Sequence, residues 1–418
     1  MQYTMIRNVS LFFVLMLLAL PDVQAQNATN SPFSIFGIGE FEVRDFGRTT
    51  GMGSTGIGYQ SENFLNRRNP AGLSGIDTLR FILDVSAAVK FSEFSTKAFK
   101  GKITNFNFKT LAIGLRLSKK WTSSAGLCPY SNVGYQLKDQ QLIPGTDVSN
   151  VTTFSSTGGV NKFYWANAFE LFKGFSIGVT SSYIFGNITR NEDTEVFSIK
   201  DMYNVSKLYF DFGAQYLQRL GKYTQITVGG VYGYKSEMLV QQQNQVTSYG
   251  VVERDQRLPD RKSYIPESYG AGFSILRNKK AAEWILAADY QYCNWSADRL
   301  SYRGLKYADS RVLSVGLQLT PNKYRPENYF QVMRFHLGAS YNQSYLKVNG
   351  YQMNDVSVSV GVGLPFINKR TYERSYVNIS ANFGESGTGQ KGGITERYAL
   401  LSVNLSLIER WFAKRQWD

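Results

Sequence analysis

The sequence predicts an all-β fold, a transmembrane antiparallel β-barrel of about 14 strands with an N-terminal plug, or hatch, in its lumen. The first observation is an alternation of apolar and polar residues that recurs from residue 79 onward. The second is that large aliphatic and aromatic residues fill the apolar positions, while Gly, Ser, Asn and Gln fill the others. The third is that residues 26–78 lack this alternation. A soluble β-sandwich would expose a charged face, whereas a membrane barrel turns its apolar face to lipid and small polar residues to the lumen.

Each alternating segment is expected to form one strand, because a period of two gives a strand one apolar and one polar face. The segments are 79–92, 104–118, 121–137, 157–170, 173–187, 203–219, 223–238, 264–277, 282–296, 309–320, 331–347, 353–365, 373–384 and 396–412. An even number of strands closes a single-chain bacterial barrel whose termini both face the periplasm. The last segment ends on Trp411 and Phe412, which fits the C-terminal sorting signal of outer-membrane barrels.

The first 25 residues have the pattern of a secretory signal peptide. Arg7 supplies the positive start, and the apolar run 11–20 is too short to span a bilayer as a helix. Val23 and Ala25 fit a cleavage site after Ala25. The predicted organisation is a signal peptide (1–25), a hatch (26–78) and a barrel (79–418) in the outer membrane of a diderm bacterium.

Composition and charge fit a membrane barrel. Aromatic residues make up 15% of the chain, and such barrels place them in belts at both interfaces. The formal net charge is +14, but the basic residues lie in short turns between strands, so no nucleic-acid partner is expected. On the periplasmic side these turns would contact outer-membrane lipid and lipopolysaccharide, or an acidic periplasmic partner. The polar stretches 241–243 and 384–393 are expected in long external loops.

The third strand segment carries Pro129 between Cys128 and Tyr130. Proline donates no ladder hydrogen bond and is confined to edges or bulges, yet a closed barrel has no edge strand. The sheet is therefore expected to break or bend at Cys128, Pro129 and Tyr130, with the hatch covering the freed polar groups. The sequence leaves open whether Cys128 pairs with Cys293.

Parity places several ionisable residues on the lumen side of the predicted strands. They are Arg116, Asp211, Asp289, Arg334 and His336. Such residues avoid lipid, and they either form a structural polar network or line a path for a ligand. Both interpretations stay open.

Two motifs suggest other chemistry but lack the context that it needs. Residues 51–56 match the G-x-G-x-x-G pattern of dinucleotide sites, but no βαβ unit surrounds them, so no cofactor is expected. The single histidine, His336, shares a strand face with Ser340 at about 13 Å, too far for a Ser–His hydrogen bond, and a hydrolase would need a serine from across the lumen. One histidine without clustered ligands predicts no metal site, and the chain is not expected to be an enzyme.

The N-terminal segment carries a distinctive series of small residues before the first strand. The series is Gly47-Arg48, then Gly51-Met52-Gly53-Ser54-Thr55-Gly56, then Asn69-Pro70-Ala71-Gly72-Leu73. This order resembles the FadL-type outer-membrane transporters of fatty acids and other hydrophobic compounds. The resemblance implies a barrel of the predicted kind, and a kink in the third strand, where Pro129 lies, that opens the wall sideways. It also implies a hatch seated by Gly51, Gly53, Gly56, Asn69, Pro70 and Ala71.

Two functional hypotheses follow. The leading one is passive uptake of small hydrophobic compounds through the lumen and a lateral opening at the third strand. Partition of apolar surface out of water would drive uptake, since the sequence has no phosphate-binding loop for ATP. The alternative is a non-transporting structural subunit of a larger outer-membrane complex for protein insertion, export or envelope assembly, with other envelope proteins docked on its turns or loops.

Overall fold

The computed structural model describes residues 30–96, 100–142, 149–279, 281–295, 307–323, 326–348, 350–367, 373–389 and 393–411. The predicted signal peptide (1–25) and Phe412 lie outside these residues. Signal-peptide cleavage therefore stays a prediction.

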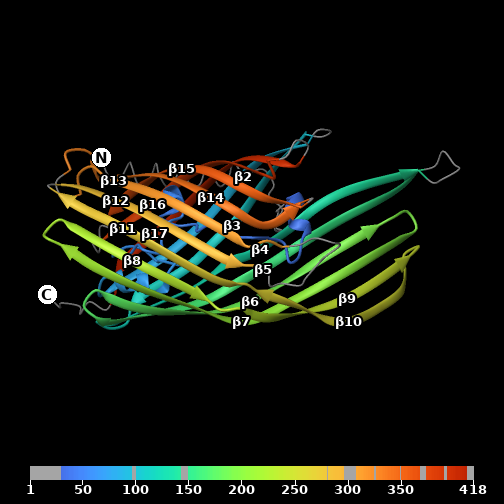
Figure 1. The fold of residues 1–418 in the computed structure, drawn as a ribbon, viewed down its shortest axis with the longest axis horizontal. Coiled ribbons are helices and arrows are strands. Elements are labelled where there is room, and N and C mark those ends of the chain that lie inside the picture. The colour runs from blue at the N-terminus through green and yellow to red at the C-terminus, as the bar shows by residue number, and fades with distance from the viewer. Residues whose placement is uncertain are drawn as a thin grey trace, which may run out of the picture.

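The described chain forms a closed antiparallel barrel of 14 strands, which confirms the predicted fold class (Figure 1). Around the barrel the order is β2-β3-β4-β5-β6-β7-β8-β11-β12-β13-β14-β15-β16-β17, and β17 pairs with β2 to close the wall. The strands are β2 (Arg80–Ser95), β3 (Lys100–Arg116), β4 (Trp121–Leu142), β5 (Ser149–Phe172), β6 (Phe175–Asp193), β7 (Phe197–Leu220), β8 (Thr224–Gly233), β11 (Glu267–Lys279), β12 (Ala282–Asn294), β13 (Ser310–Thr320), β14 (Arg334–Val348), β15 (Tyr351–Ile367), β16 (Arg374–Gly387) and β17 (Thr395–Arg410). Each overlaps one predicted segment.

The alternation of the sequence sorts side chains between the two faces of this wall. In β15, Val356 and Val358 are 54% and 50% exposed on the outside, whereas Ser357 and Ser359 are 4% and 1% exposed inside. An outward apolar face is stable only against lipid, so the wall has the character of an outer-membrane barrel. Among the described residues no helix has the length and apolar character needed to cross a membrane.

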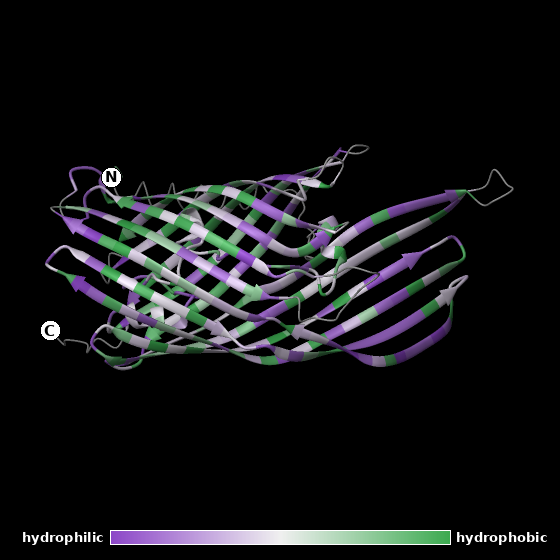
Figure 2. Cartoon of the chain, viewed as in Figure 1, coloured by the Kyte–Doolittle hydropathy of each residue, from purple (hydrophilic) through white to green (hydrophobic). Residues whose placement is uncertain are grey.

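Several strands continue beyond the barrel on one side only, towards the right of Figure 1. There β9 (Ser236–Ser248) pairs with the first part of β7, and β10 (Val251–Ile265) pairs with β9. We call this extension the projecting sheet. It consists of residues 133–142 of β4, 149–160 of β5, 184–193 of β6 and 197–205 of β7, together with β9 and β10. Figure 2 shows its strands mainly purple and white, because polar residues predominate once the strands leave the apolar band.

The prediction of an external loop at 241–243 is wrong, because these residues lie within β9. Met238 and Val240 are buried on the inner face of β9, and the Gln242 side chain donates to Asp201 Oδ1 at 3.4 Å. Pairing with β7 and β10 on both sides overrides the loop-like glutamine composition. The other predicted loop, 384–393, begins inside β16, which runs to Gly387.

The segment before β2 lies inside the barrel and crosses its lumen. It contains 3₁₀ turns and one short strand: η1 (Pro32–Ile35), β1 (Glu40–Phe41), η2 (Thr50–Met52) and η3 (Pro70–Gly75). The turn η2 packs on β13 to β16, whereas η3 packs on β4 to β7, so the two turns contact different parts of the wall. A further turn, η4 (Tyr329–Val332), joins β13 to β14. We call residues 30–78 the hatch segment.

Candidate functional site: the hatch segment and the β3–β4 boundary

Asn69 connects the hatch segment to itself and to the wall. It is fully buried, and its Oδ1 accepts a hydrogen bond from the Ala71 N–H at 3.0 Å, which caps η3 ahead of Pro70. Its Nδ2 donates to the carbonyl oxygens of Ile57 at 2.9 Å and of Ala214 in β7 at 3.1 Å. The structure thus brings Asn69, Pro70 and Ala71 together where the hatch segment meets the wall.

Gly51 and Gly53 lie against the opposite part of the wall. Gly53 has φ of 67°, in the left-handed region that favours glycine, and its N–H donates to Ser359 Oγ in β15 at 2.9 Å. A Cβ on Gly51 would lie 3.0 Å from the Cβ of His336 in β14. Both glycines therefore allow the hatch backbone to approach β14 and β15 closely.

Asp289 in β12 holds the hatch backbone with its carboxylate. Its Oδ2 accepts hydrogen bonds from the Gly56 N–H at 2.6 Å and from the Ile57 N–H at 2.9 Å. Hydrogen bonds to an ionised acceptor are stronger than neutral ones, particularly away from water. The predicted lumen residue Asp289 and the predicted hatch residue Gly56 therefore form one contact.

Glycines of the wall form a path on which the hatch backbone rests. They are Gly178 and Gly213 beneath residues 69–71, Gly229 and Gly272 beneath residues 57 and 58, and Gly316 and Gly338 beneath residues 52 and 53. A Cβ on Gly229 would collide with the Ile57 carbonyl, and a Cβ on Gly338 with the Gly53 amide. Glycine inside a strand often marks a close approach of another backbone. The predictions from the sequence missed these positions, although that signal was present.

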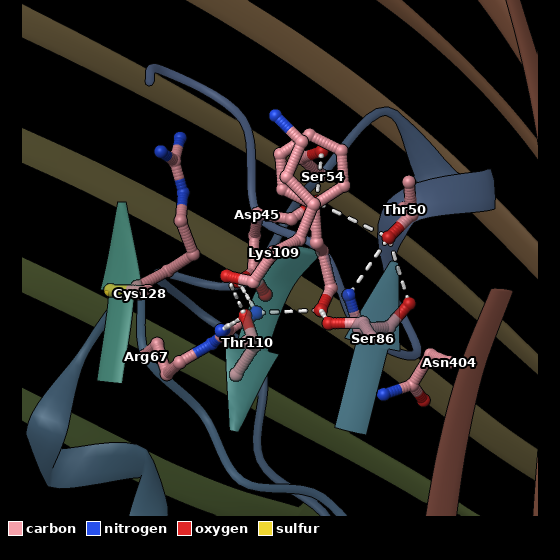
Figure 3. Close-up of polar contacts among 12 residues, drawn as sticks. Asp45, Thr50, Ser54, Arg67, Ser86, Lys109, Thr110, Cys128 and Asn404 are labelled. Carbon is pink, nitrogen blue, oxygen red and sulfur yellow. Dashed lines mark hydrogen bonds and ion pairs between the residues drawn. The ribbon is translucent and has the colours of Figure 1, made fainter. Parts of the chain in front are cut away.

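Arg67 joins the hatch segment to β3 (Figure 3). Its guanidinium donates to Thr110 Oγ1 in β3, pairs with the buried carboxylate of Asp45, and donates to the Phe46 carbonyl at 2.7 Å. The Ser86 hydroxyl of β2 donates to the same Phe46 carbonyl at 2.8 Å. One arginine thereby ties two parts of the hatch segment to the wall. Neither Arg67 nor Asp45 was predicted from the sequence.

His336 belongs to a second polar group that also involves the hatch segment. Arg48 donates from Nε and Nη2 to Gln318 Oε1 at 3.2 and 2.9 Å, and His336 Nε2 lies 3.3 Å from the same oxygen. Ser340 instead shares a hydrogen bond of 2.8 Å with Ser357 Oγ. His336 and Ser340 therefore have different partners. Within the described residues no group of three or more His, Cys, Asp or Glu side chains is arranged to hold a metal ion.

The other predicted lumen residues lie at three separate places. Arg116 donates to the carbonyl oxygens of Ser74 and Ile76 at 3.1 and 2.9 Å, at the end of the hatch segment. The Arg334 guanidinium carbon lies 3.4 Å from the centre of the Tyr376 ring. Asp211 faces a cavity that is described below. The five predicted residues therefore do not form a single cluster.

The pairing of β3 with β4 is interrupted near Pro129. The two strands pair only from Leu111↔Leu127 to Arg116↔Thr122, while β4 continues to pair with β5 through a bulge between Pro129 and Ser131. Beyond Leu127, no described residue of β3 pairs with β4. A break at Pro129 is what proline inside a barrel strand predicts.

The hatch segment bonds to the part of β4 that β3 leaves. Glu40 and Phe41 pair with Asn132 and Ser131, and the Ser31 N–H donates to the Gly134 carbonyl at 2.7 Å. Towards β3 the bonds run through side chains. They include Asn30 N–H to Asn105 Oδ1 at 2.9 Å and an ion pair between Lys109 and Glu42. The hatch segment thus supplies hydrogen-bond partners on both sides of this boundary, as burial of polar groups requires.

A cavity of about 460 Å³ lies next to this boundary. Cys128, Pro129 and Tyr130 line it from β4, and Asp211 lines it from β7. Cys128 and Cys293 both border the cavity and are free thiols. The structure therefore places the three predicted gate residues and one predicted lumen residue at a single cavity, whereas their role as a gate stays a prediction.

Comparison with protein families gives a match over nearly the whole chain. The model of the family described as BamG matches residues 5–418. Among curated proteins, no significant match is found.

Solved structures with the same fold include transporters of hydrophobic compounds. A toluene transporter, TodX from Pseudomonas putida, has a TM-score of 0.59 at 14% identity, covering 89% of this chain and 100% of that chain. A FadL homologue from Pseudomonas aeruginosa has a TM-score of 0.57 at 13% identity, with coverage of 89% and 100%. The monoaromatic hydrocarbon channel CymD has a TM-score of 0.53 at 15% identity, with coverage of 90% and 99%. At these identities the similarity shows a FadL-like fold.

Proposed function

This chain belongs to the BamG family, and from that premise we propose that it is a structural subunit of the BAM assembly complex in the outer membrane. It would act there as a non-transporting and non-enzymatic barrel that binds other envelope proteins. The observation that carries this proposal is the family match over residues 5–418. It favours the assembly hypothesis over the uptake of hydrophobic compounds.

The anchoring of the hatch segment supports a barrel that stays closed. Asn69 bonds to β7, Asp289 of β12 holds Gly56 and Ile57, and Arg67 bonds to β3. These contacts lie on well-separated strands of the wall. Opening the lumen would break several of them together, at a cost of about 1 kcal/mol for each neutral hydrogen bond and more for charged ones.

The charged groups in the lining of the cavity also favour this proposal. It includes many charged groups, among them Arg44, Lys90, Lys109, Lys162, Asp211 and Glu396. A pocket for a hydrophobic compound is lined mainly by apolar and aromatic side chains, with few polar groups. Aromatic residues also line the cavity, among them Phe41, which packs on Trp295 at 4.8 Å and on Tyr345 at 5.2 Å between ring centres.

The test is isolation of the tagged full-length chain from its own outer membrane in mild detergent, followed by mass spectrometry. An unrelated barrel with the same tag and expression level serves as the control. We expect subunits of the BAM assembly complex in stoichiometric amounts with this chain and not with the control. Recovery of a lone monomer would overturn the proposal.

Uptake of small hydrophobic compounds remains the second candidate, because the β3–β4 interruption lies beside the cavity. Liposomes with purified protein would be assayed for uptake of a labelled alkyl or aromatic compound. Glu40 and Asn132 are register partners, so cysteines at both positions, with Cys128 and Cys293 replaced by Ser, would lock the hatch segment to β4. Uptake that stops on oxidation and returns on reduction would favour this candidate. No uptake above empty liposomes would remove it.

A further inference from the structure

The projecting sheet has two edges that no other described strand covers. Its strand order runs β4, β5, β6, β7, β9 and β10, so β10 forms one edge and the outer part of β4 forms the other. Exposed edges can pair with a strand from another chain, and proteins usually guard against this. The two edges differ in how well they are guarded.

The β10 edge is guarded by its sequence. Residues 251–262 are mostly exposed, and they carry charged side chains of both signs together with Pro259. The ladder between β9 and β10 also has irregularities between Val252 and Arg254 and between Leu258 and Arg261. Charge, proline and bulges are the devices that disfavour the addition of a strand.

The β4 edge has few such devices. Residues 136–142 pair with 155–149 of β5 in an unbroken register, and no other described strand pairs with them. This stretch has one Lys and one Asp, no proline, and two exposed leucines, Leu137 and Leu142, at 42% and 71% exposure. We call residues 136–142 the β4 edge.

The hydrogen bonds of Gly134 show which backbone groups of the β4 edge point outward. Its carbonyl accepts from the Ser31 N–H at 2.7 Å and its N–H donates to Ser34 Oγ at 3.1 Å, so both groups point away from β5. In an antiparallel strand the N–H and C=O of one residue point to the same side, and this side alternates along the strand. The regular register therefore directs the N–H and C=O groups of residues 136, 138, 140 and 142 outward.

The same side of β4 already binds an added strand nearer to the barrel, where β1 pairs with Ser131 and Asn132. We propose that the β4 edge binds an extended segment of a partner subunit by strand addition, continuing the position that β1 begins. This inference rests on the proposed function, since the partner is a subunit of the same complex. Main-chain hydrogen bonds would supply the affinity, and contacts made by every second side chain of the segment would supply the specificity.

The surroundings of the β4 edge define the chemistry and location of the partner. The side chains of Gln136, Lys138 and Gln140 share one face, and Leu137 and Asp139 lie on the other. The fitting segment is about seven residues long and amphipathic, with an apolar side chain beside Leu137 and polar side chains on the opposite face. Residues 136–142 are exposed on both faces of the strand, and most of their side chains are polar, so this part of β4 lies beyond the apolar band of the wall. Bacterial barrels have short periplasmic turns and long external extensions, so we place the partner segment on the external side of the membrane.

The experiment uses full-length chain in its own outer membrane, with a photo-crosslinking amino acid at Gln140 or, as a matched control, at Arg257 in β10. We expect an adduct with a complex subunit from position 140 and none from position 257. Lys138→Pro removes an outward N–H without touching the β4–β5 ladder, and we expect it to lower the adduct at least tenfold. Lys138→Ala keeps the N–H, and we expect the adduct to stay within twofold.

Heat-modifiable migration on gels verifies that Lys138→Pro is folded, and Gln136→Pro replaces it if it is not. An adduct that survives in the folded proline variant, or that contains a second copy of this chain, overturns the inference. So does a missing adduct at position 140 in cells where the complex co-purifies with the chain, and in that case the proposed function stands. If no envelope protein co-purifies, the proposed function and the inference both fail.

Discussion

The β17–β2 and β3–β4 boundaries of the barrel wall are built in different ways. At β17–β2, where the ends of the barrel sequence meet, pairing runs from Arg80↔Arg410 to Ser95↔Thr395. At β3–β4 it stops at Leu111↔Leu127, and the hatch segment takes over. The wall of a barrel can therefore be completed by a segment from its lumen. Where a proline interrupts strand pairing, that segment supplies hydrogen-bond partners for the strand that has lost its neighbour.

The two sides also hold the hatch segment by different means. On the side of β3 the contacts are ion pairs and charged hydrogen bonds, such as Arg67 with Thr110 and Lys109 with Glu42. On the side of β11 to β15 the hatch backbone rests on wall glycines and on the carboxylate of Asp289, and one ion pair joins Arg44 to Asp355 of β15. If contacts near the β3–β4 boundary, the interrupted side, depend on charge, removing one charge there should lower the stability more than removing one near β11 to β15, the continuous side.

The largest effect is expected for Arg67→Met. The substitution leaves Asp45, whose side chain is 5% exposed, as an unpaired buried charge, and breaking a buried pair costs about 3–5 kcal/mol. The urea midpoint of unfolding in detergent, followed by tryptophan fluorescence, measures the loss. The double variant Arg67→Met/Asp45→Asn is the control, and we expect it to regain part of the stability because no lone charge remains. A double variant no more stable than Arg67→Met would contradict the role of the ion pair.

Asp289→Asn probes the continuous side and is expected to have a smaller effect. The amide keeps the shape of the side chain but lacks the charge that strengthens the bonds from Gly56 and Ile57. Hydrogen bonds to charged groups are worth about 1.5–3 kcal/mol, so the loss in unfolding free energy should be of that order. Glu385→Gln on the exposed face of the barrel should change the same measurement by less than about 0.5 kcal/mol. A loss larger than that of Arg67→Met would reverse the comparison.

The sequence predicted the wall better than it predicted the contacts of the hatch segment. Period-two alternation located every barrel strand, and Pro129 indicated where pairing would fail, because both signals are local. Arg67 and Thr110 are 43 residues apart, and their contact depends on the path of the hatch segment, which has no periodic pattern. The strand β9 was missed because its glutamines resemble a loop until β7 and β10 pair with it.

A third prediction compares two neighbouring glycines of β8. A Cβ on Gly229 would collide with the Ile57 carbonyl of the hatch segment, whereas a Cβ on Gly230 meets only the Gly270 carbonyl at 3.8 Å. Gly229→Ala should therefore lower the unfolding free energy by about 1–3 kcal/mol through overpacking. Gly230→Ala is the matched control and should change it little. Equal effects of the two variants would show that the close approach at Gly229 contributes nothing.

The smallest effect is expected at Glu40, on the interrupted side, and it should depend on pH. Burial raises the pKa of the Glu40 carboxyl and Glu396 raises it further, while Lys90 opposes the shift. A raised pKa means that the folded state prefers the protonated acid. The contribution of Glu40 to stability is therefore complete below its ordinary pKa of about 4.5 and is lost as the pH rises through the folded value.

Glu40→Gln keeps a neutral side chain at every pH, so it should raise the urea midpoint near pH 7 relative to the parent chain and leave it unchanged near pH 4. Glu385→Gln, which lies in an exposed ion pair with Arg397, should show no such pH-dependent difference. If Glu40→Gln lowers the midpoint at pH 7, the carboxylate stabilises the junction of β1 with β4. Charge would then stabilise the β3–β4 boundary at Glu40 as it does at Arg67. The backbone pairing of β1 with Ser131 and Asn132 would not be the main support of that boundary.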